Sequence, residues 1–149
     1  MTYRFKLTAT ISASPRQIYD AWLDSRGHRA MTGGKAKQSG KVGAPVTAWN
    51  GYISGKNLEL VPGRRIVQSW RTTKFTDAHK DSRITVTLKA VKDGTRITLA
   101  HVGVPDGQTS YQRGGWQSHY FEPMKKYFAR RAKSSAVAKK RAAAKKISR

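Results

Sequence analysis

Residues 82–102 constrain the fold most, because they hold two runs of alternating apolar and polar residues around a short turn. The run "SRITVTLKAV" is separated from "TRITLAHV" by "KDG". A period of two is typical of a strand, and an Asp-Gly turn between two such runs predicts a β-hairpin. One face of this hairpin collects Ile84, Val86, Leu88, Ala90, Ile97, Leu99 and His101. Such alternation predicts an antiparallel sheet with one covered face and one wet face.

The segment that would cover this sheet is "GWQSHYFEPMKKYF", residues 115–128. Trp116, Tyr120, Pro123 or Met124, and Tyr127 recur at spacings of three and four, which predicts a long helix over about residues 109–132. Since proline has no N–H to donate, Pro123 is expected to kink the helix or to divide it into two pieces. The aromatic side chains would then lie across the concave face of the sheet.

The beginning of the chain predicts a strand followed by a short helix. "YRFKLTATI" alternates, and in "SASPRQIYDAWLD" Ser14 and Gln17 form a capping box around Pro15 at the first helical position. The helix is expected to break near "SRGHRAMTGG", where glycines permit tight turns. Residues 35–103 are expected to form successive strands joined by short turns.

Charge separates the chain into a predicted domain, residues 1–132, and a basic tail, residues 133–149. The net charge is +22, and residues 129–149 hold nine Lys or Arg and no acid. The tail offers too little apolar surface to order itself, so we expect it to be disordered and dispensable for folding. It would act as a solubility tail, bind anionic membrane surfaces, or bind nucleic acid nonspecifically through Lys139, Lys140, Arg141, Lys145 and Lys146.

Several classes of protein are disfavoured by what the sequence lacks. It contains no cysteine, which excludes disulfides and thiolate chemistry. Its first residues alternate instead of forming the apolar run of a secretion signal, and no apolar run approaches the roughly 20 residues of a membrane span. These features predict a cytoplasmic protein.

Four segments together resemble a known family: "ISASPRQIYDAWLDS", "LVPGRRIVQSWR", "DGTRITLAHVGVP" and "GWQSHYFEPMKKYF". Over residues 3–128 the chain resembles START-like (SRPBCC) domains of the heat-shock protein 90 ATPase activator-like family. The resemblance implies an α+β helix-grip fold. In such a fold a curved antiparallel sheet of about six to seven strands wraps around a long C-terminal helix, with a short helix after the first strand.

The resemblance also implies an apolar cavity between sheet and helix, in a fold whose members differ in chemistry. Many family members carry a Trp-Trp pair shortly after the first helix, where this chain has "HRAMTGG". Met31 and Thr32 would edge the cavity in place of that pair. A chaperone partner is implied by the family alone.

No motif in the sequence indicates metal or nucleotide chemistry. The four histidines show no zinc-ligand spacing, and no P-loop, GxGxxG or GxSxG motif is present. We therefore assign no catalytic residue, no metal and no cofactor. His101 has two interpretations: a hydrogen-bonded histidine at a strand end, or a group that orients a ligand or acts as an acid or base.

The favoured function is non-enzymatic binding of a small hydrophobic ligand between sheet and helix. The candidate ligand-binding residues are Trp22, Met31, Trp49, Trp70, Ile84, Val86, Leu88, Leu99, His101, Trp116, Tyr120 and Met124. Large aromatics also build ordinary cores, so the same residues are consistent with core packing alone. Two alternatives stay open: a cyclase- or hydrolase-like enzyme using His101 and Tyr120, and a chaperone-associated interaction module. A homodimer is compatible with each.

Overall fold

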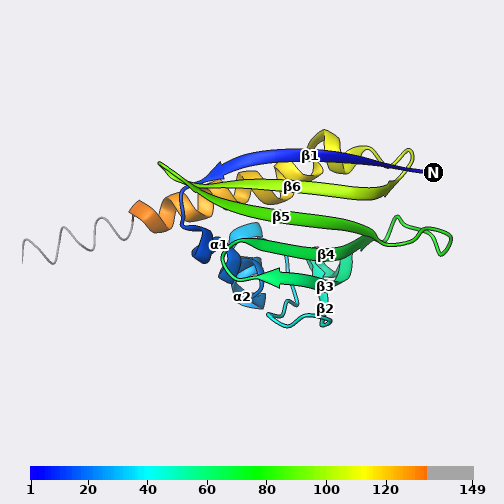
Figure 1. Ribbon diagram of the computed structural model, residues 1–149, viewed down its shortest axis with the longest axis horizontal. Coiled ribbons are helices and arrows are strands. Elements are labelled where there is room, and N and C mark those ends of the chain that lie inside the picture. The colour runs from blue at the N-terminus through cyan, green and yellow to red at the C-terminus, as the bar shows by residue number, and fades with distance from the viewer. Residues whose placement is uncertain (134–149) are drawn as a thin grey trace, which may run out of the picture.

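The computed structural model describes residues 1–133, and it forms an open antiparallel sheet with helices against its concave face (Figure 1). The sheet order is β1-β6-β5-β4-β3-β2. The elements are β1 (Thr2–Ile11), α1 (Pro15–Trp22), α2 (Ser25–Thr32), β2 (Pro45–Ala48), the 3₁₀ turn η1 (Trp49–Gly51), β3 (Ile53–Val61), β4 (Arg65–Thr72), β5 (Ser82–Val91), β6 (Gly94–Pro105), and the π-helical turns η2 (Tyr111–Gly115) and η3 (Gln117–Phe121). The predicted α+β fold is confirmed, with six strands.

The predicted hairpin is the centre of this sheet. β5 and β6 pair from Arg83 opposite Val102 to Val91 opposite Gly94. The turn also touches the end of β1, because a Cβ built on Gly94 would lie 2.0 Å from the carbonyl oxygen of Ile11. Gly94 has a φ of 143°, a backbone conformation that L side chains rarely adopt. Glycine therefore allows β1 to pass close to the β5–β6 turn.

The N-terminal half contains one helix more than we predicted. The capping box of α1 is present, with the Ser14 side chain and the Gln17 side chain each bonded to the other's backbone N–H. Residues expected to form turns instead form α2, which Asp24 caps by accepting from the Gly27 N–H at 2.8 Å. A glycine at position 27 allows α2 to pass close to α1, because a Cβ there would lie 2.9 Å from the Cα of Ala21.

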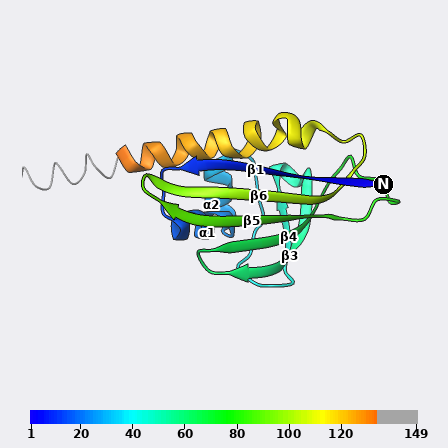
Figure 2. The same ribbon diagram turned by 45° about the horizontal axis from the view of Figure 1, so that its top comes forward.

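The C-terminal helix is continuous through Pro123, contrary to one of the two outcomes expected there. Residues 110–133 run along the length of the sheet, behind β1 and β6 in Figure 1 and above them in Figure 2. The helix is kinked instead at Gly114, whose φ of 172° and ψ of −14° are not helical. The turns before the proline are π-helical, and the Glu122 N–H donates to Gln117 five residues earlier. A widened turn moves the preceding carbonyls away from the proline ring, so the helix does not divide.

The hydrophobic core lies between this helix, α1, α2 and the concave face of the sheet. Its fully buried side chains include Trp22, Met31, Phe121 and Met124, and Ile97 and Leu99 of the hairpin. Among the described residues no helix is long and apolar enough to cross a membrane. The residues predicted to bind nucleic acid, Lys139, Lys140, Arg141, Lys145 and Lys146, lie outside the described range, as does the rest of the predicted tail beyond residue 133.

Replacing Gly94 by alanine tests the close approach of β1 to the hairpin turn. The Gly94→Ala variant should lose about 1–3 kcal/mol of unfolding free energy, because the new methyl group clashes with backbone that cannot easily move. Urea denaturation measures this loss. Gly40→Ala is the matched control, since a Cβ at Gly40 meets nothing within 4 Å. Equal stability of the two variants would contradict the close approach.

Candidate functional site: an aromatic pocket at the π-helical turns

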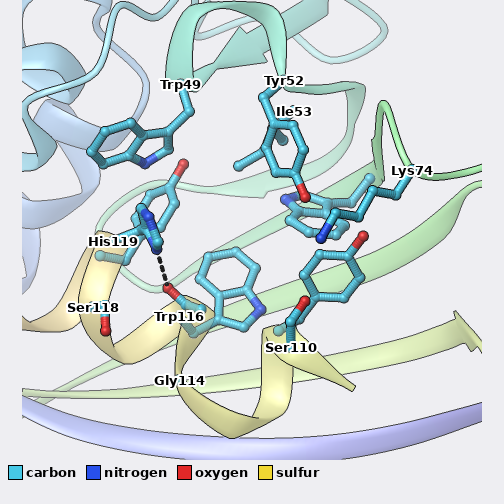
Figure 3. Close-up of a pocket in the computed structure, with 13 residues that line it drawn as sticks. Trp49, Tyr52, Ile53, Lys74, Ser110, Gly114, Trp116, Ser118 and His119 are labelled. Carbon is cyan, nitrogen blue, oxygen red and sulfur yellow. Dashed lines mark hydrogen bonds between the residues drawn. The ribbon is translucent and has the colours of Figure 1, made fainter. Parts of the chain in front are cut away.

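A pocket of about 470 Å³ lies between the turn before β3, strand β4 and the π-helical turns (Figure 3). Its wall is mainly aromatic, with a few polar groups at the rim. The lining residues are Trp49, Tyr52, Ile53, Trp70, Lys74, Ser110, Tyr111, Gly114, Gly115, Trp116, Ser118, His119 and Tyr120. Lys74, Ser110, Ser118 and His119 are exposed, so the pocket opens to solvent.

One wall comes from the turn that joins β2 to β3. Trp49 and Asn50 both have positive φ, 50° and 61°, which is uncommon for residues other than glycine. The turn is held by backbone bonding to Lys35: the Asn50 N–H donates to the Lys35 carbonyl at 2.9 Å, and the Lys35 N–H donates to the Asn50 side chain at 3.1 Å. This unusual backbone points the indole of Trp49 into the site (Figure 3).

The Trp49 indole packs against a neighbouring ring, but its N–H lacks a hydrogen-bond partner. Its ring meets the exposed imidazole of His119 edge to face, with ring centres 5.1 Å apart. Its Nε1 is buried and has no hydrogen-bond partner among the described residues. Buried N–H groups without partners are uncommon in proteins, so this donor is an unusual feature of the pocket wall.

The opposite wall comes from the π-helical turns. Tyr111 and Trp116 are five residues apart, a spacing that an α-helix would put on different faces. Because η2 is π-helical, both rings meet Trp70 of β4, at centre distances of 4.9 Å for Tyr111 and 5.5 Å for Trp116. Tyr120 continues this wall, 4.8 Å from Trp116. The widened helix therefore determines which rings line the pocket.

A chain of hydrogen bonds fixes Trp116 to the sheet. The Trp116 indole N–H donates to Nδ1 of His101 at 3.2 Å, and Nε2 of His101 lies 2.8 Å from the Ser82 hydroxyl. Ser82 donates its own proton to the Trp70 carbonyl at 2.6 Å. Because indole donates only and Ser82 has used its proton, His101 must carry its proton on Nε2. Both of its ring nitrogens are thus engaged.

A second chain fixes Tyr120. The Nδ1 of His28 lies 2.8 Å from the Trp22 carbonyl, and its Nε2 lies 2.8 Å from the Tyr120 hydroxyl. A carbonyl only accepts, so Nδ1 carries the proton and Tyr120 donates to Nε2. The Tyr120 ring also stacks on Trp22, with centres 5.1 Å apart. Helices α1 and α2 thereby hold this part of the pocket wall in place.

Burial keeps both histidines neutral. It lowers the pKa of His101 to about 3. Burial also lowers the pKa of His28 to about 4, against the smaller opposing effect of its hydrogen bond to the Trp22 carbonyl. Desolvation raises the pKa of Tyr111 to about 12 and raises the pKa of Tyr120 well above its ordinary value. The rings at the back of the pocket are therefore uncharged near pH 7.

Four of the predicted ligand-binding residues line the pocket: Trp49, Trp70, Trp116 and Tyr120. The other eight do not line it; they are Trp22, Met31, Ile84, Val86, Leu88, Leu99, His101 and Met124, and all are buried in or beside the core. We expected the hairpin to form the pocket floor with Trp22 and Met31 at the edge. The open space lies instead at the π-helical end of the helix, beside Trp49 and Trp70.

Three residues that complete the site were not predicted from the sequence. Tyr52, Lys74 and Tyr111 line the pocket, and the buried His28 supports it from behind. Tyr52 follows the Asn50-Gly51 turn signal, which could have marked it. Tyr111 could not be found from a period of 3.6, since it shares a face with Trp116 only in a π-helical turn.

The polar groups of the site do not form the pair proposed for an enzyme. His101 bonds Ser82 and Trp116, whereas Tyr120 bonds His28, so the two belong to separate networks. Among residues 1–133 there is also no group of three or more His, Cys, Asp or Glu side chains that could hold a metal ion. The arrangement is suited to holding aromatic rings in fixed orientations.

Acid should destabilise the protein through its two buried histidines. Their folded pKa values lie below the ordinary 6.5, so the unfolded chain binds protons first as the pH falls. The stabilisation is complete above pH 6.5 and is lost progressively toward pH 4 for His28 and pH 3 for His101, at roughly 2–3 kcal/mol for each histidine by pH 4.5. Urea denaturation between pH 7 and pH 4.5 measures this loss.

The matched variants for this measurement are His101→Gln and His119→Gln. The first should be less stable at pH 7 but should lose less stability on acidification than the unmodified chain. The second replaces an exposed histidine and should follow the unmodified chain. If His101→Gln follows it too, His101 does not titrate as its burial indicates.

Comparisons with known proteins identify the family of this chain. The sequence profile of the family "Activator of Hsp90 ATPase homolog 1-like protein" matches residues 12–129. The human protein "Activator of 90 kDa heat shock protein ATPase homolog 1" is 28% identical over 127 residues, which are 85% of this chain and 37% of that protein. A Dictyostelium discoideum homolog is 27% identical over 131 residues, 86% of this chain and 33% of its own length. The chain thus spans about a third of the length of these relatives.

Solved structures share the fold. An HSP90 activator from Plasmodium falciparum, PFC0360w, superposes with a TM-score of 0.71 at 23% identity, covering 80% of this chain and 91% of that one. The Aha1 dimer from Colwellia psychrerythraea gives a TM-score of 0.70 at 17% identity, covering 85% and 96%. The family profile covers most of the described residues, and the resemblance in the four sequence segments is confirmed. The chain belongs to the Activator of Hsp90 ATPase homolog 1-like family.

Proposed function

We propose that the protein binds a small, flat, largely apolar ligand in the aromatic pocket. The observation that carries this proposal is the wall of six aromatic side chains around about 470 Å³ of open space: Trp49, Tyr52, Trp70, Tyr111, Trp116 and Tyr120. A volume of this size lies within the range of small-molecule sites, and such sites are mostly apolar with a few placed polar groups. Rings attract flat ligands by stacking and edge contacts.

The fixed positions of the wall rings favour ligand binding over the alternative that the space is only a gap in the packing of the core. Trp116 and Tyr120 are each anchored by a hydrogen bond to a buried histidine. Rings that are already fixed lose little conformational freedom when a ligand enters, which reduces the cost of binding. The exposed ammonium of Lys74 at the rim and the unpartnered Nε1 of Trp49 in the wall only donate, so a ligand with an acceptor such as a carbonyl or carboxylate is favoured.

Titration with an apolar fluorophore such as 8-anilinonaphthalene-1-sulfonate tests the pocket. Binding should quench tryptophan emission, because three of the four tryptophans line the site. Tyr52→Ala should weaken the affinity about tenfold or more, since it removes a ring from the wall. Trp116→Ala should weaken it further, because it also leaves His101 Nδ1 without its donor.

The control is Tyr127→Ala, which removes another half-buried tyrosine of the described chain that does not line the pocket. It should leave the fluorophore affinity within about twofold of that of the unmodified chain. Equal weakening by Tyr52→Ala and Tyr127→Ala, or saturating fluorophore with no change in emission, would overturn ligand binding at this site.

A second candidate function is action on an Hsp90-type chaperone. Family membership favours it, although the chain spans about a third of the human and Dictyostelium relatives and their whole activity need not reside in this part. A homodimer of this chain also stays a prediction; the Colwellia psychrerythraea protein is described as a dimer. The cytoplasmic location expected from the sequence is consistent with either function.

An ATPase assay tests the chaperone candidate separately from the pocket. Adding the full chain to a purified Hsp90-type chaperone from the same organism should raise the ATP turnover of the chaperone severalfold. An inhibitor of the chaperone ATPase should abolish the increase, which controls for contaminating activity. Unchanged turnover at a large molar excess of the chain would remove this candidate and would leave the pocket proposal unaffected.

A further inference from the structure

The convex face of the sheet carries cations without acids on its three strands β1, β5 and β6. The outward positions of these strands are those whose neighbours in the same strand point into the core. Five of the outward side chains are exposed cations: Arg4, Lys6, Arg83, Lys89 and Arg96. None of the five forms an ion pair with a residue in the described part of the chain.

The register places two of these charges against each other, because Lys89 of β5 lies directly opposite Arg96 of β6. Arg83 lies opposite the uncharged Val102. Like charges directly opposite in neighbouring strands destabilise a sheet. Glu59 and Asp81 pair with other cations, Arg65 and Arg71, so the one acid beside these strands without an ion pair in the described chain is Asp93 of the β5–β6 turn. Five cations exceed this single acid, so the positive charge of the face is available to an external anion.

The remaining outward positions distinguish between classes of partner. They carry hydroxyl groups, from Thr2, Thr8, Thr10, Thr85, Thr87 and Thr98, with Val91, Ala100 and Val102 as the apolar residues. Among residues 1–133 the exposed large hydrophobic side chains are Met1, Val42 and Leu58, and none occupies one of these outward positions. A protein interface needs buried aromatic or aliphatic anchors at its centre, whereas phosphates are bound by cations, hydroxyls and N–H groups alone.

We propose that this convex face binds the phosphate backbone of double-stranded nucleic acid without reading its sequence. Arg83 and Lys89 are six residues apart on β5, so the cations extend over roughly 20 Å along the strands. A duplex carries one phosphate charge per about 1.7 Å of its axis, so a contact of that length meets on the order of ten phosphates. The face is distinct from the aromatic pocket, which lies on the concave side.

The test compares two full-length variants with equal net charge in binding a fluorescein-labelled 20-base-pair DNA duplex. One variant, Arg83→Gln/Lys89→Gln/Arg96→Gln, removes three cations from the convex face. The control, Arg26→Gln/Lys35→Gln/Lys37→Gln, removes three exposed cations from α2 and the loop after it. Fluorescence anisotropy at several salt concentrations gives the affinity and its salt dependence for each chain.

The convex-face variant should bind more weakly, and the slope of log affinity against log salt should become shallower by about 2–3, since each lost phosphate contact removes about 0.9. The control should change the slope by less than 1. Circular dichroism checks folding. If the triple variant unfolds, Lys89→Gln alone should still make the slope shallower by about 1.

Two outcomes would overturn the proposal. Equal losses in the two triple variants would mean that DNA responds to net charge and not to this face. Loss of binding to poly-glutamate in the convex-face variant, with DNA binding unchanged, would indicate an acidic polypeptide partner instead.

Discussion

The hydrogen bond from the Trp116 indole to His101 is the polar contact that joins the C-terminal helix to the sheet. His101 is fully buried on the concave face, where each ring nitrogen must find a partner or incur a desolvation penalty. Ser82 satisfies one nitrogen from within the sheet, and the helix satisfies the other. The bond therefore fixes the Trp116 ring to β6 and, through Ser82, to β5. His28 of α2 bonds the Tyr120 hydroxyl in the same way. Two neutral histidines, one on the sheet and one on α2, therefore hold rings of the C-terminal helix.

Local patterns in the sequence were sufficient for most of the fold. The β5–β6 hairpin, the capping box at Ser14 and the helical nature of residues 115–128 each follow from spacings within a few residues. The errors arise where tertiary contacts decide. Gly27 is a turn signal when considered alone, yet it lies within α2. The glycine serves there to let α2 approach Ala21 of α1 closely. The pocket was placed over the hairpin, whereas its position depends on the π-helical turns, whose five-residue spacing no search at 3.6 detects.

The sheet separates two kinds of chemistry because strands alternate. Residues that are neighbours in sequence, such as Ile97 and Arg96, point to opposite faces, one into the core and one into solvent. Aromatic rings and neutral histidines gather on the concave side, and threonines and unpaired cations gather on the convex side. The two faces share the same strands, but substitutions on one face leave the side chains of the other in place. Substitutions that test the proposed pocket should accordingly leave the proposed polyanion surface in place, and the reverse should also hold.

The π-helical turn at Tyr111–Gly115 contains one residue more than an α-helix would use for the same rise. Deleting a residue there, at Gln112 for example, would put Tyr111 four residues before Trp116, a spacing that keeps both rings on one face of an α-helix. Inserting a residue at the same place would instead rotate Tyr111 by about 100° relative to Trp116. Tyr111 would then leave Trp70 and its bond with Thr72, although every aromatic side chain would still be present. The length of one turn therefore decides the shape of the cavity, and the insertion of one codon can remodel it as thoroughly as replacing a ring.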